Sequence, residues 1–203
     1  MKNAVKSVVT LTLITVVAGL LLGYVYELTK DPIAAKELEA KYNAYRAVFP
    51  AAADFKASDK IDIASSKDVL NGSGLYKESI DECLTAVDAS GKALGYVLTV
   101  TTSEGYGGDI TISMGISLDG VLNGIEILSI SETAGLGMKA DTDQFKGQFK
   151  DKKVSQFNYT KSGASAEYEV DAISGATITT NAMVNAVNAG LVYTGSLAGG
   201  QDE

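Results

Sequence analysis

The chain has 203 residues, of which 46% are hydrophobic and 21% are charged, and its net charge is −8. This length and composition predict one folded domain with a packed core and exclude a largely disordered chain. The acidic balance excludes nucleic-acid binding, which requires a basic surface, and charge-driven adhesion to anionic lipid.

An uncharged run near the amino terminus predicts a membrane anchor. Residues 7–26 read SVVTLTLITVVAGLLLGYVY, and these twenty residues, at about 1.5 Å per helical residue, match the roughly 30 Å hydrocarbon core of a bilayer. A cleaved secretory signal is the alternative. The run exceeds the usual apolar region of a signal, however, and bulky residues follow it where small ones would mark cleavage. We therefore expect a retained anchor over residues 7–28, after a short tail of residues 1–6.

Residues 29–74 are predicted to form a stalk helix and a connecting segment. Asp31 and Pro32 fit a helix start, with aspartate as the cap and proline at the first helical position. Apolar residues then recur at near-helical spacing up to Phe49-Pro50. Residues 51–74, rich in Ala, Asp, Ser and Lys, indicate a connecting segment. Basic residues lie on both sides of the anchor, so the sequence alone leaves the side of the membrane open.

Short strands dominate from residue 75, and we expect a domain over residues 75–195. Ser90-Gly91 and Asp119-Gly120 predict hairpin turns, and alternation over residues 110–116 predicts a half-buried strand. Further strands are expected at 84–89, 95–101, 121–130, 154–159 and 168–173, with helices at 142–149 and 180–192. Strands with few helices and no regular βαβ alternation predict an α+β fold. Residues 196–203 are expected to be a flexible tail.

Two residue types narrow the chemistry that the chain can perform. It has no histidine, which excludes a Ser-His-Asp triad and an imidazole metal site. Its one cysteine, Cys83, excludes an internal disulfide and a cysteine-ligated iron–sulfur cluster, and we expect it to be a small buried residue. Redox chemistry would therefore require an organic cofactor.

The segment DAISGATITT, residues 171–180, predicts a strand end, a turn of small residues and a helix start. Hydroxyl groups and free backbone N–H groups at the amino terminus of a helix attract phosphate. The hydroxyls belong to Ser174, Thr177, Thr179 and Thr180. Ordinary helix capping by Thr179 or Thr180 is the alternative.

Two glycine-containing segments and one aromatic segment precede this turn. Gly105-Tyr106-Gly107-Gly108 leads into the alternating strand, and its glycines would let a backbone approach a ligand closely while the tyrosine flanks a ring. Glu132-Thr133-Ala134-Gly135-Leu136-Gly137 follows the next strand, and residues 145–149 read FKGQF. Plain loops between strands are the alternative.

These segments, in this order, resemble the FMN-binding domain family, which includes the G subunit of the Rnf complex and the C subunit of the sodium-translocating NADH:quinone reductase. Ser174-Gly175-Ala176-Thr177 resembles the covalent flavinylation motif of the family. In the second glycine segment, Ala134 stands where the family usually has proline, a departure that should loosen the loop slightly. The resemblance implies FMN (covalent), joined through its phosphate to the Thr177 hydroxyl as a phosphoester and installed from FAD by a flavin transferase.

The resemblance also implies which residues surround the cofactor, and it implies neither a catalytic side chain nor a metal site. Besides Thr177, the expected FMN-binding residues are Ser174, Gly175, Ala176, Tyr106, Gly107, Glu132, Thr133, Gly135 and Leu136.

The order of short tail, anchor, stalk and domain resembles the Rnf protein more than its quinone reductase counterpart, which usually has a longer chain. It implies an electron carrier, not a complete catalyst, within a ferredoxin:NAD oxidoreductase coupled to Na⁺ or H⁺ movement. The implied partners are the other Rnf subunits, a flavin transferase and membrane lipid. The implied location is the bacterial inner membrane, crossed once, with the domain extracytoplasmic and the short tail cytoplasmic.

Three alternatives stay open. The chain could be the corresponding component of a Na⁺-translocating NADH:quinone reductase, similar to its C subunit, or a free-standing extracytoplasmic flavin electron carrier. It could also be a membrane-tethered binding module without redox chemistry, whose glycines only shape loops.

Overall fold

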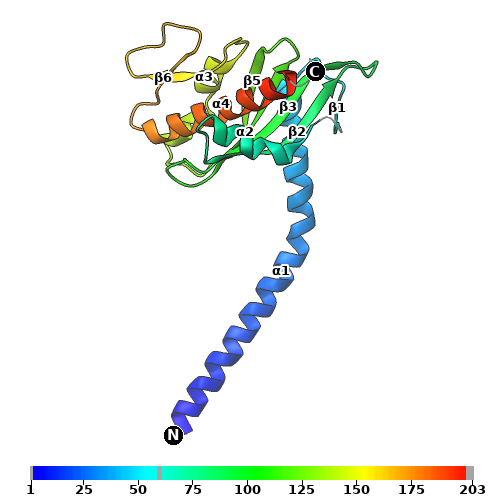
Figure 1. Cartoon of the computed structure of the whole chain (residues 1–203). Helices are drawn as coiled ribbons and strands as arrows, with labels where there is room; N and C mark the ends of the chain where they lie inside the picture. Colours follow the sequence, from blue (N-terminus) through cyan, green and yellow to red (C-terminus); the bar gives the residue numbers. More distant parts are fainter. Residues whose placement is uncertain (1, 59–60, 200–203) are drawn as a thin grey trace. The chain divides into compact units, whose positions relative to one another are not determined.

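The computed structural model of the protein describes residues 2–58 and 61–199 (Figure 1). The chain divides into two compact units, Met1–Ala40 and Lys41–Glu203. In chain order the elements are α1 (Lys2–Val48), β1 (Asp54–Lys56), the 3-10 helix η1 (Ile63–Ser65), α2 (Ser66–Gly72), β2 (Glu78–Val87), β3 (Ala93–Thr102), β4 (Ile110–Ser117), β5 (Leu122–Ser129), η2 (Gly137–Asp141), α3 (Asp143–Lys146), η3 (Gly147–Phe149), β6 (Asn158–Thr160), β7 (Glu169–Asp171) and α4 (Thr177–Gly199).

The first unit contains α1 as far as Ala40, and the apolar part of this helix is long enough to cross a membrane. An 18-residue window of α1 has a mean hydropathy of 2.3, and none of it is buried. The predicted apolar helix is therefore confirmed. The helix start predicted at Asp31 and Pro32 is wrong, because α1 continues through Pro32 without a break. Proline removes one backbone donor and crowds the preceding turn. The hydrogen bonds of the neighbouring turns are kept, so the helix continues on both sides of Pro32.

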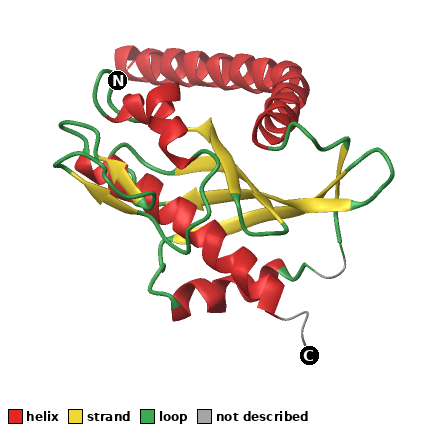
Figure 2. Ribbon diagram, turned by 90° about the horizontal axis from the view of Figure 1, so that it is seen from above, coloured by secondary structure: helices red, strands yellow, loops and turns green. Residues whose placement is uncertain are grey.

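The second unit is built on a five-stranded sheet in the order β1-β2-β3-β4-β5, with every neighbouring pair antiparallel. Both predicted hairpins are confirmed. Their turns contain Gly91, with φ of +85°, and Gly120, with φ of +81°, a backbone region that glycine enters without strain. Figure 2 shows α4 running across the sheet, where it contacts β2, β3 and β4. This arrangement confirms the predicted α+β fold.

The main core lies between α4 and the sheet. Leu98 and Met114 from the sheet and Met183 and Val187 from α4 are fully buried. Gly190 lets the helix come close, since a Cβ atom at this position would overlap the sulfur of Met114. Burial of this kind stabilises a fold by roughly 25 cal/mol for each Å² of apolar surface removed from water.

Cys83 belongs to the same core, as the sequence predicts. Its side chain is buried among apolar neighbours. Burial, together with the nearby charge of Glu82, raises the pKa of the Cys83 thiol to about 12. The thiol is therefore uncharged at neutral pH, and Cys83 serves as a small apolar core residue.

The half-buried strand predicted over residues 110–116 is instead buried on both faces. The second face of the sheet is covered by the end of α1 and the residue after it, where Tyr45, Val48 and Phe49 form a smaller core. Gly115 makes this packing possible, because a Cβ atom there would lie 2.6 Å from the carbonyl oxygen of Val48. The alternation in β4 therefore indicates which side chains belong to the main core, and Gly115 between them faces the end of α1.

A polar cluster fixes the end of α1 to this second face. The Tyr45 hydroxyl donates to the carboxylate of Glu82 and is hydrogen-bonded to Thr99 Oγ1 at 2.7 Å. The Lys41 amine lies 2.6 Å from the same Glu82 carboxylate. Burial raises the pKa of Tyr45, and its hydrogen bond to Glu82 raises it further, so the phenol stays protonated and keeps donating.

The segment 51–74, predicted only to connect, contains β1, η1 and α2. β1 pairs with β2 at the sheet edge, and α2 buries Leu70 in the main core. The Tyr193 hydroxyl of α4 donates to the carbonyl of Asp62 at 3.0 Å. The segment is therefore part of the folded unit, which begins at Lys41 and not at residue 75.

The carboxyl-terminal half differs from the expected pattern in its details. The helix predicted over 142–149 is split into α3 and η3, after the separate turn η2. The two later strands shorten to β6 and β7, which pair with each other in parallel. α4 extends to Gly199, past the predicted end at 192 and into the predicted tail. The rest of that tail, residues 200–203, lies outside the described residues.

Candidate functional site

The turn between β7 and α4 has a defined backbone conformation. Gly175 has φ of +76°, which an L side chain would adopt only with strain. The Ala176 N–H donates to the carbonyl of Ile173 at 3.0 Å, and the Thr180 N–H donates to the carbonyl of Ala176 at 3.0 Å. α4 therefore begins at Thr177, and the backbone N–H groups of Thr177, Ile178 and Thr179 have no acceptor within the helix.

Thr180 holds this turn together from inside the fold. Its hydroxyl is buried, accepts from the N–H of Ile173 at 3.0 Å and donates to the carbonyl of Ala176 at 2.9 Å. The alternative of helix capping by Thr179 or Thr180 is wrong, because α4 begins two residues before Thr179 and both side chains lie inside its first turns.

The remaining hydroxyls of the turn differ in their surroundings. Thr179 is buried, whereas Ser174 is exposed. Thr177 is half-buried, and no hydrogen bond engages its hydroxyl within residues 2–58 and 61–199. Thr177 therefore offers a hydroxyl that is both accessible and uncommitted at the start of a helix.

A cavity of about 620 Å³ lies against Thr177, and we call it the Thr177 cavity. It is formed by the loop before β4, the loop after β5 and the start of α4, which are far apart in the sequence. Its lining residues are Tyr106, Glu132, Thr133, Leu136, Gly137, Gly175, Ala176, Thr177, Ile178 and Thr179. The structure thus brings together most of the residues that the sequence singled out.

Three of the predicted residues do not line this cavity. Gly107 is next to the lining residue Tyr106, and its N–H donates to Glu132 Oε1 at 3.2 Å. Gly135 has φ of +78°, and a Cβ atom there would point into open space. A larger side chain at this position would therefore strain the backbone without crowding the cavity. Ser174 lines a separate cavity on the other side of the turn.

Glu132 lines the Thr177 cavity and is closely surrounded by glycines. A Cβ atom on Gly137 would lie 2.5 Å from Glu132 Oε2 and 2.7 Å from the hydroxyl oxygen of Thr179. A Cβ atom on Gly105 would lie 3.0 Å from Glu132 Oε1. These glycines serve close packing around a buried carboxylate, a role that the sequence alone does not reveal.

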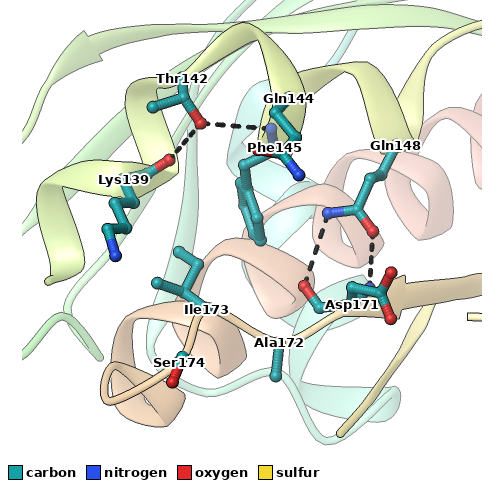
Figure 3. A pocket seen from close by; sticks show the side chains of 9 residues that line it. All are labelled: Lys139, Thr142, Gln144, Phe145, Gln148, Asp171, Ala172, Ile173 and Ser174. Atoms are coloured by element: carbon teal, nitrogen blue, oxygen red, sulfur yellow. Dashed lines mark hydrogen bonds between the residues drawn. The ribbon is translucent and has the colours of Figure 1, made fainter. Parts of the chain in front are cut away.

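The cavity that contains Ser174 has a volume of about 320 Å³ and is bounded by α3 and the end of β7 (Figure 3). Gln148 fixes the strand at its edge, because its Oε1 accepts from the Asp171 N–H at 2.6 Å and its Nε2 donates to the Asp171 carbonyl at 3.5 Å. The FKGQF segment, with Phe145 lining the same cavity, therefore positions the chain that enters the turn.

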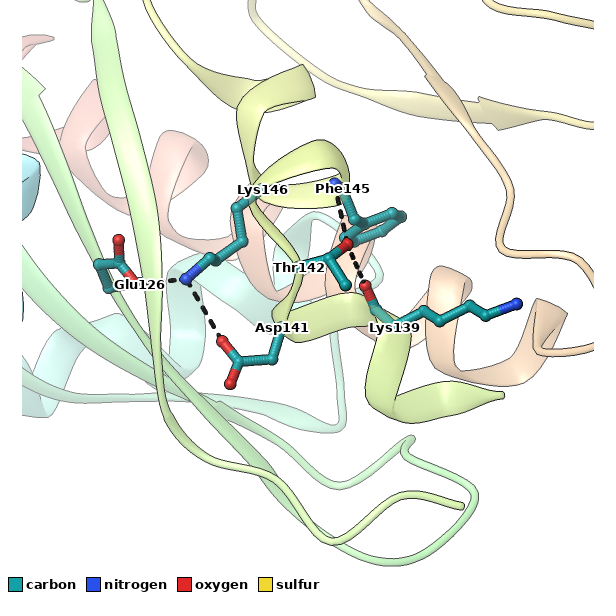
Figure 4. A network of polar contacts seen from close by, with 6 residues as sticks. All are labelled: Glu126, Lys139, Asp141, Thr142, Phe145 and Lys146. Atoms are coloured by element: carbon teal, nitrogen blue, oxygen red, sulfur yellow. Dashed lines mark hydrogen bonds and ion pairs between the residues drawn. The ribbon is translucent and has the colours of Figure 1, made fainter. Parts of the chain in front are cut away.

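An ion-pair network attaches α3 to the sheet (Figure 4). The Lys146 amine lies 2.6 Å from Glu126 Oε2 and 3.3 Å from Asp141 Oδ1. Desolvation lowers the pKa of Lys146, but the two carboxylates more than offset it and the pKa lies above its usual range. Lys146 is therefore charged at neutral pH. Its ion pairs hold α3 in place beside the cavity that contains Ser174.

Two family models match the chain. A model described as FMN-binding domain matches residues 105–192, which hold every residue that lines the Thr177 cavity. A model described as RnfG N-terminal region matches residues 1–48. The two matches therefore cover both the apolar helix and the candidate site.

Curated relatives match over most of their length. The G subunit of an ion-translocating oxidoreductase complex from Methanosarcina acetivorans is 34% identical, and the match covers 98% of both chains. The G subunit of a Na⁺-translocating ferredoxin:NAD⁺ oxidoreductase complex from Acetobacterium woodii is 33% identical over 88% of this chain and 85% of its own. A proton-translocating counterpart from Clostridium ljungdahlii is 28% identical over 94% of this chain and 91% of its own.

A solved structure shares the fold. The C subunit of the Na⁺-translocating NADH-quinone reductase from Parabacteroides distasonis superposes with a TM-score of 0.51 and 21% sequence identity. The superposition covers 80% of this chain and 83% of the other.

Proposed function

This chain belongs to the family of G subunits of ion-translocating oxidoreductase complexes, and on that premise we propose that it carries FMN covalently on Thr177. The chain is an electron-transfer subunit of an ion-translocating ferredoxin:NAD oxidoreductase, and it binds FMN through its FMN-binding domain. The covalent bond, the residues around the cofactor and the side of the membrane are parts of the proposal.

One observation carries the covalent proposal: the uncommitted Thr177 hydroxyl opens into a cavity at the first turn of α4. The free N–H groups of that turn and the positive end of the helix dipole favour a phosphate group there. The cavity volume of about 620 Å³ lies within the range that cofactor sites usually have. The residues present therefore fit the phosphate end of FMN.

The attachment itself uses only one oxygen of the chain. Transfer from FAD would join the Thr177 oxygen to the FMN phosphorus, break the pyrophosphate bond and release AMP. The proton of the Thr177 hydroxyl would pass to a base of the flavin transferase. Thr180 and Gly175 keep the turn in the conformation that presents this oxygen.

The bound FMN supplies the redox chemistry, and the chain supplies position. A phosphoester at Thr177 would keep the cofactor from diffusing between partners, which suits a relay inside a complex. Tyr106 and Leu136 would contact the bound group from the two loops, and Glu132 joins these loops by accepting a hydrogen bond from the Gly107 N–H.

The alternatives have different consequences. A subunit of a Na⁺-translocating NADH:quinone reductase would have the same fold and the same covalent attachment. Identifying the membrane proteins encoded by the neighbouring genes would therefore distinguish the two complexes. A binding module without redox chemistry would carry no flavin after denaturation. The other subunits of the complex and a flavin transferase are the partners that the proposal requires.

We expect the protein to fluoresce after denaturation when it is produced together with a flavin transferase. A phosphoester survives the denaturing gel, whereas noncovalent FMN is lost. The measurement is an unstained gel under ultraviolet light, followed by peptide mass spectrometry of the segment 171–191. A colourless band despite an active transferase would exclude covalent attachment. If the native protein still contained noncovalent flavin, FMN binding would stand and only the covalent bond would be refuted.

We also expect the folded unit to be extracytoplasmic, which a cysteine replacement can test. Cys83 is buried, so Lys92→Cys in the exposed β2–β3 hairpin would add one accessible thiol. A membrane-impermeant maleimide should label this variant in intact cells. Lys2→Cys, at the exposed start of α1, should react only after permeabilisation. The opposite pattern would place the domain in the cytoplasm.

A further inference from the structure

A face of α4 connects the proposed attachment point to a carboxylate on the loop before β4. Thr177, Asn181 and Asn185 are four residues apart, so they lie along one side of the helix. The side-chain amides of Asn181 and Asn185 both donate to Glu104 Oε2, at 3.2 Å and 2.6 Å. A carboxylate only accepts hydrogen bonds, so two donors on one oxygen make a strong, directed contact.

Glu104 stands at one end of a short segment that carries Tyr106. At the other end, the Gly107 N–H donates to Glu132 Oε1 at 3.2 Å. Between the two attachments, Gly105 is so close to its neighbours that a Cβ atom there would overlap the carbonyl oxygen of Gly108. The backbone that presents Tyr106 is therefore held on both sides and has no room to shift inwards.

The Tyr106 side chain has little to hold it besides this backbone. It is 72% exposed, although it lines the Thr177 cavity. Within residues 2–58 and 61–199, no hydrogen bond or ring contact engages it. Its position relative to Thr177 consequently depends on what holds the segment, and the Glu104 side chain joins that segment to the same helix that begins with Thr177.

We propose that Glu104 is a positioning residue that holds the Tyr106 ring against FMN attached to Thr177. This inference rests on the proposed function and adds a determinant of the flavin environment that lies outside the motif. Glu104 itself does not line the Thr177 cavity, and its action passes through the segment 105–107. The competing explanation is a purely structural one, in which Glu104 only fastens α4 to the sheet.

Flavin fluorescence separates the two explanations, because a tyrosine ring next to a flavin quenches it by electron transfer. In the flavin-loaded protein, Tyr106→Leu should lengthen the fluorescence lifetime, and Glu104→Ala should produce most of the same increase. In a Tyr106→Leu background, Glu104→Ala should add nothing further. Glu104→Gln keeps an acceptor oxygen for the asparagines, so its lifetime should stay close to wild type.

A matched control removes a different charge from the same loop. Asp109→Ala deletes an exposed carboxylate between Gly108 and β4, and it should leave the lifetime at the wild-type value. A Glu104→Ala protein with lower thermal stability but an unchanged lifetime would support the structural explanation and overturn the proposal. An unchanged lifetime in Tyr106→Leu would overturn it as well.

A second measurement does not depend on flavin. In protein produced without a transferase, Glu104→Ala should speed exchange of the hydrogen-bonded Gly107 amide by about tenfold, the effect expected from losing a charged hydrogen bond. Unchanged exchange would overturn the positioning role. A wild-type protein that never acquires covalent flavin would instead refute the proposed function. The exchange measurement would still show whether Glu104 holds the loop that carries Tyr106.

Discussion

Thr177→Val is expected to abolish covalent flavin completely and to leave a folded, membrane-bound protein. Valine matches threonine in shape but has no oxygen to form the phosphoester. The fold should tolerate the change, because Thr177 is half-buried and its hydroxyl is engaged in no hydrogen bond within the part of the chain that the structure describes. The measurement is in-gel fluorescence normalised to protein, together with a thermal melt of the same sample.

The other hydroxyls of the turn provide matched controls. Ser174→Ala and Thr179→Val should keep the flavin, because Ser174 lies in the other cavity and Thr179 is buried. Thr180→Val should keep it too but should lower stability by about 1–3 kcal/mol, since the buried Ile173 N–H loses its acceptor. A fluorescent Thr177→Val band would refute the assignment of the attachment residue.

Gly115→Ala is expected to destabilise the folded unit by about 1–3 kcal/mol, the usual cost of overfilling a packed core. The added methyl group would lie 2.6 Å from the carbonyl oxygen of Val48 and 3.2 Å from the Phe49 ring. Main-chain atoms cannot move aside as a flexible side chain can, so β4 and the end of α1 would have to separate. For a unit of this size the melting temperature should fall by roughly 2–4 °C for each kcal/mol.

Gly147→Ala is the matched control for this prediction. Gly147 has φ of −61°, and no described residue other than its near neighbours in the chain comes within 4 Å of the position that its Cβ would occupy. The substitution should therefore change the melting temperature little. Equal melting temperatures for Gly115→Ala and wild type would show that the end of α1 does not pack against β4 as described.

The sequence predicted the parts of the fold that depend on local signals. The turns at Gly91 and Gly120 were predictable because both dipeptides favour hairpins whatever surrounds them. β1 and α2 were missed because their stability comes from partners far along the chain, such as Leu70 in the main core. The helix start predicted at Asp31 and Pro32 was wrong for a related reason, since a proline weakens one turn of a helix without interrupting it.

The candidate site was predictable to the extent that it resembles a known motif. The segments around Tyr106, Glu132 and Thr177 were recognised separately, and the structure places them around one cavity. Glu104 and its two asparagines were missed, because nothing in the sequence shows that positions about eighty residues apart share a hydrogen bond. Hydrogen bonds between polar side chains that are distant in the sequence produce no periodic pattern from which they could be predicted.

The packing of Tyr45, Val48 and Phe49 on the sheet determines where a water-soluble fragment of this protein can begin. A fragment starting at residue 75 would lack β1, α2 and these three side chains, and it would expose one apolar face of the sheet to water. Such a fragment should aggregate. A fragment starting at Lys41 keeps that face covered and retains the ion pair with Glu82, so it is a form in which we expect flavin loading to be measurable without detergent.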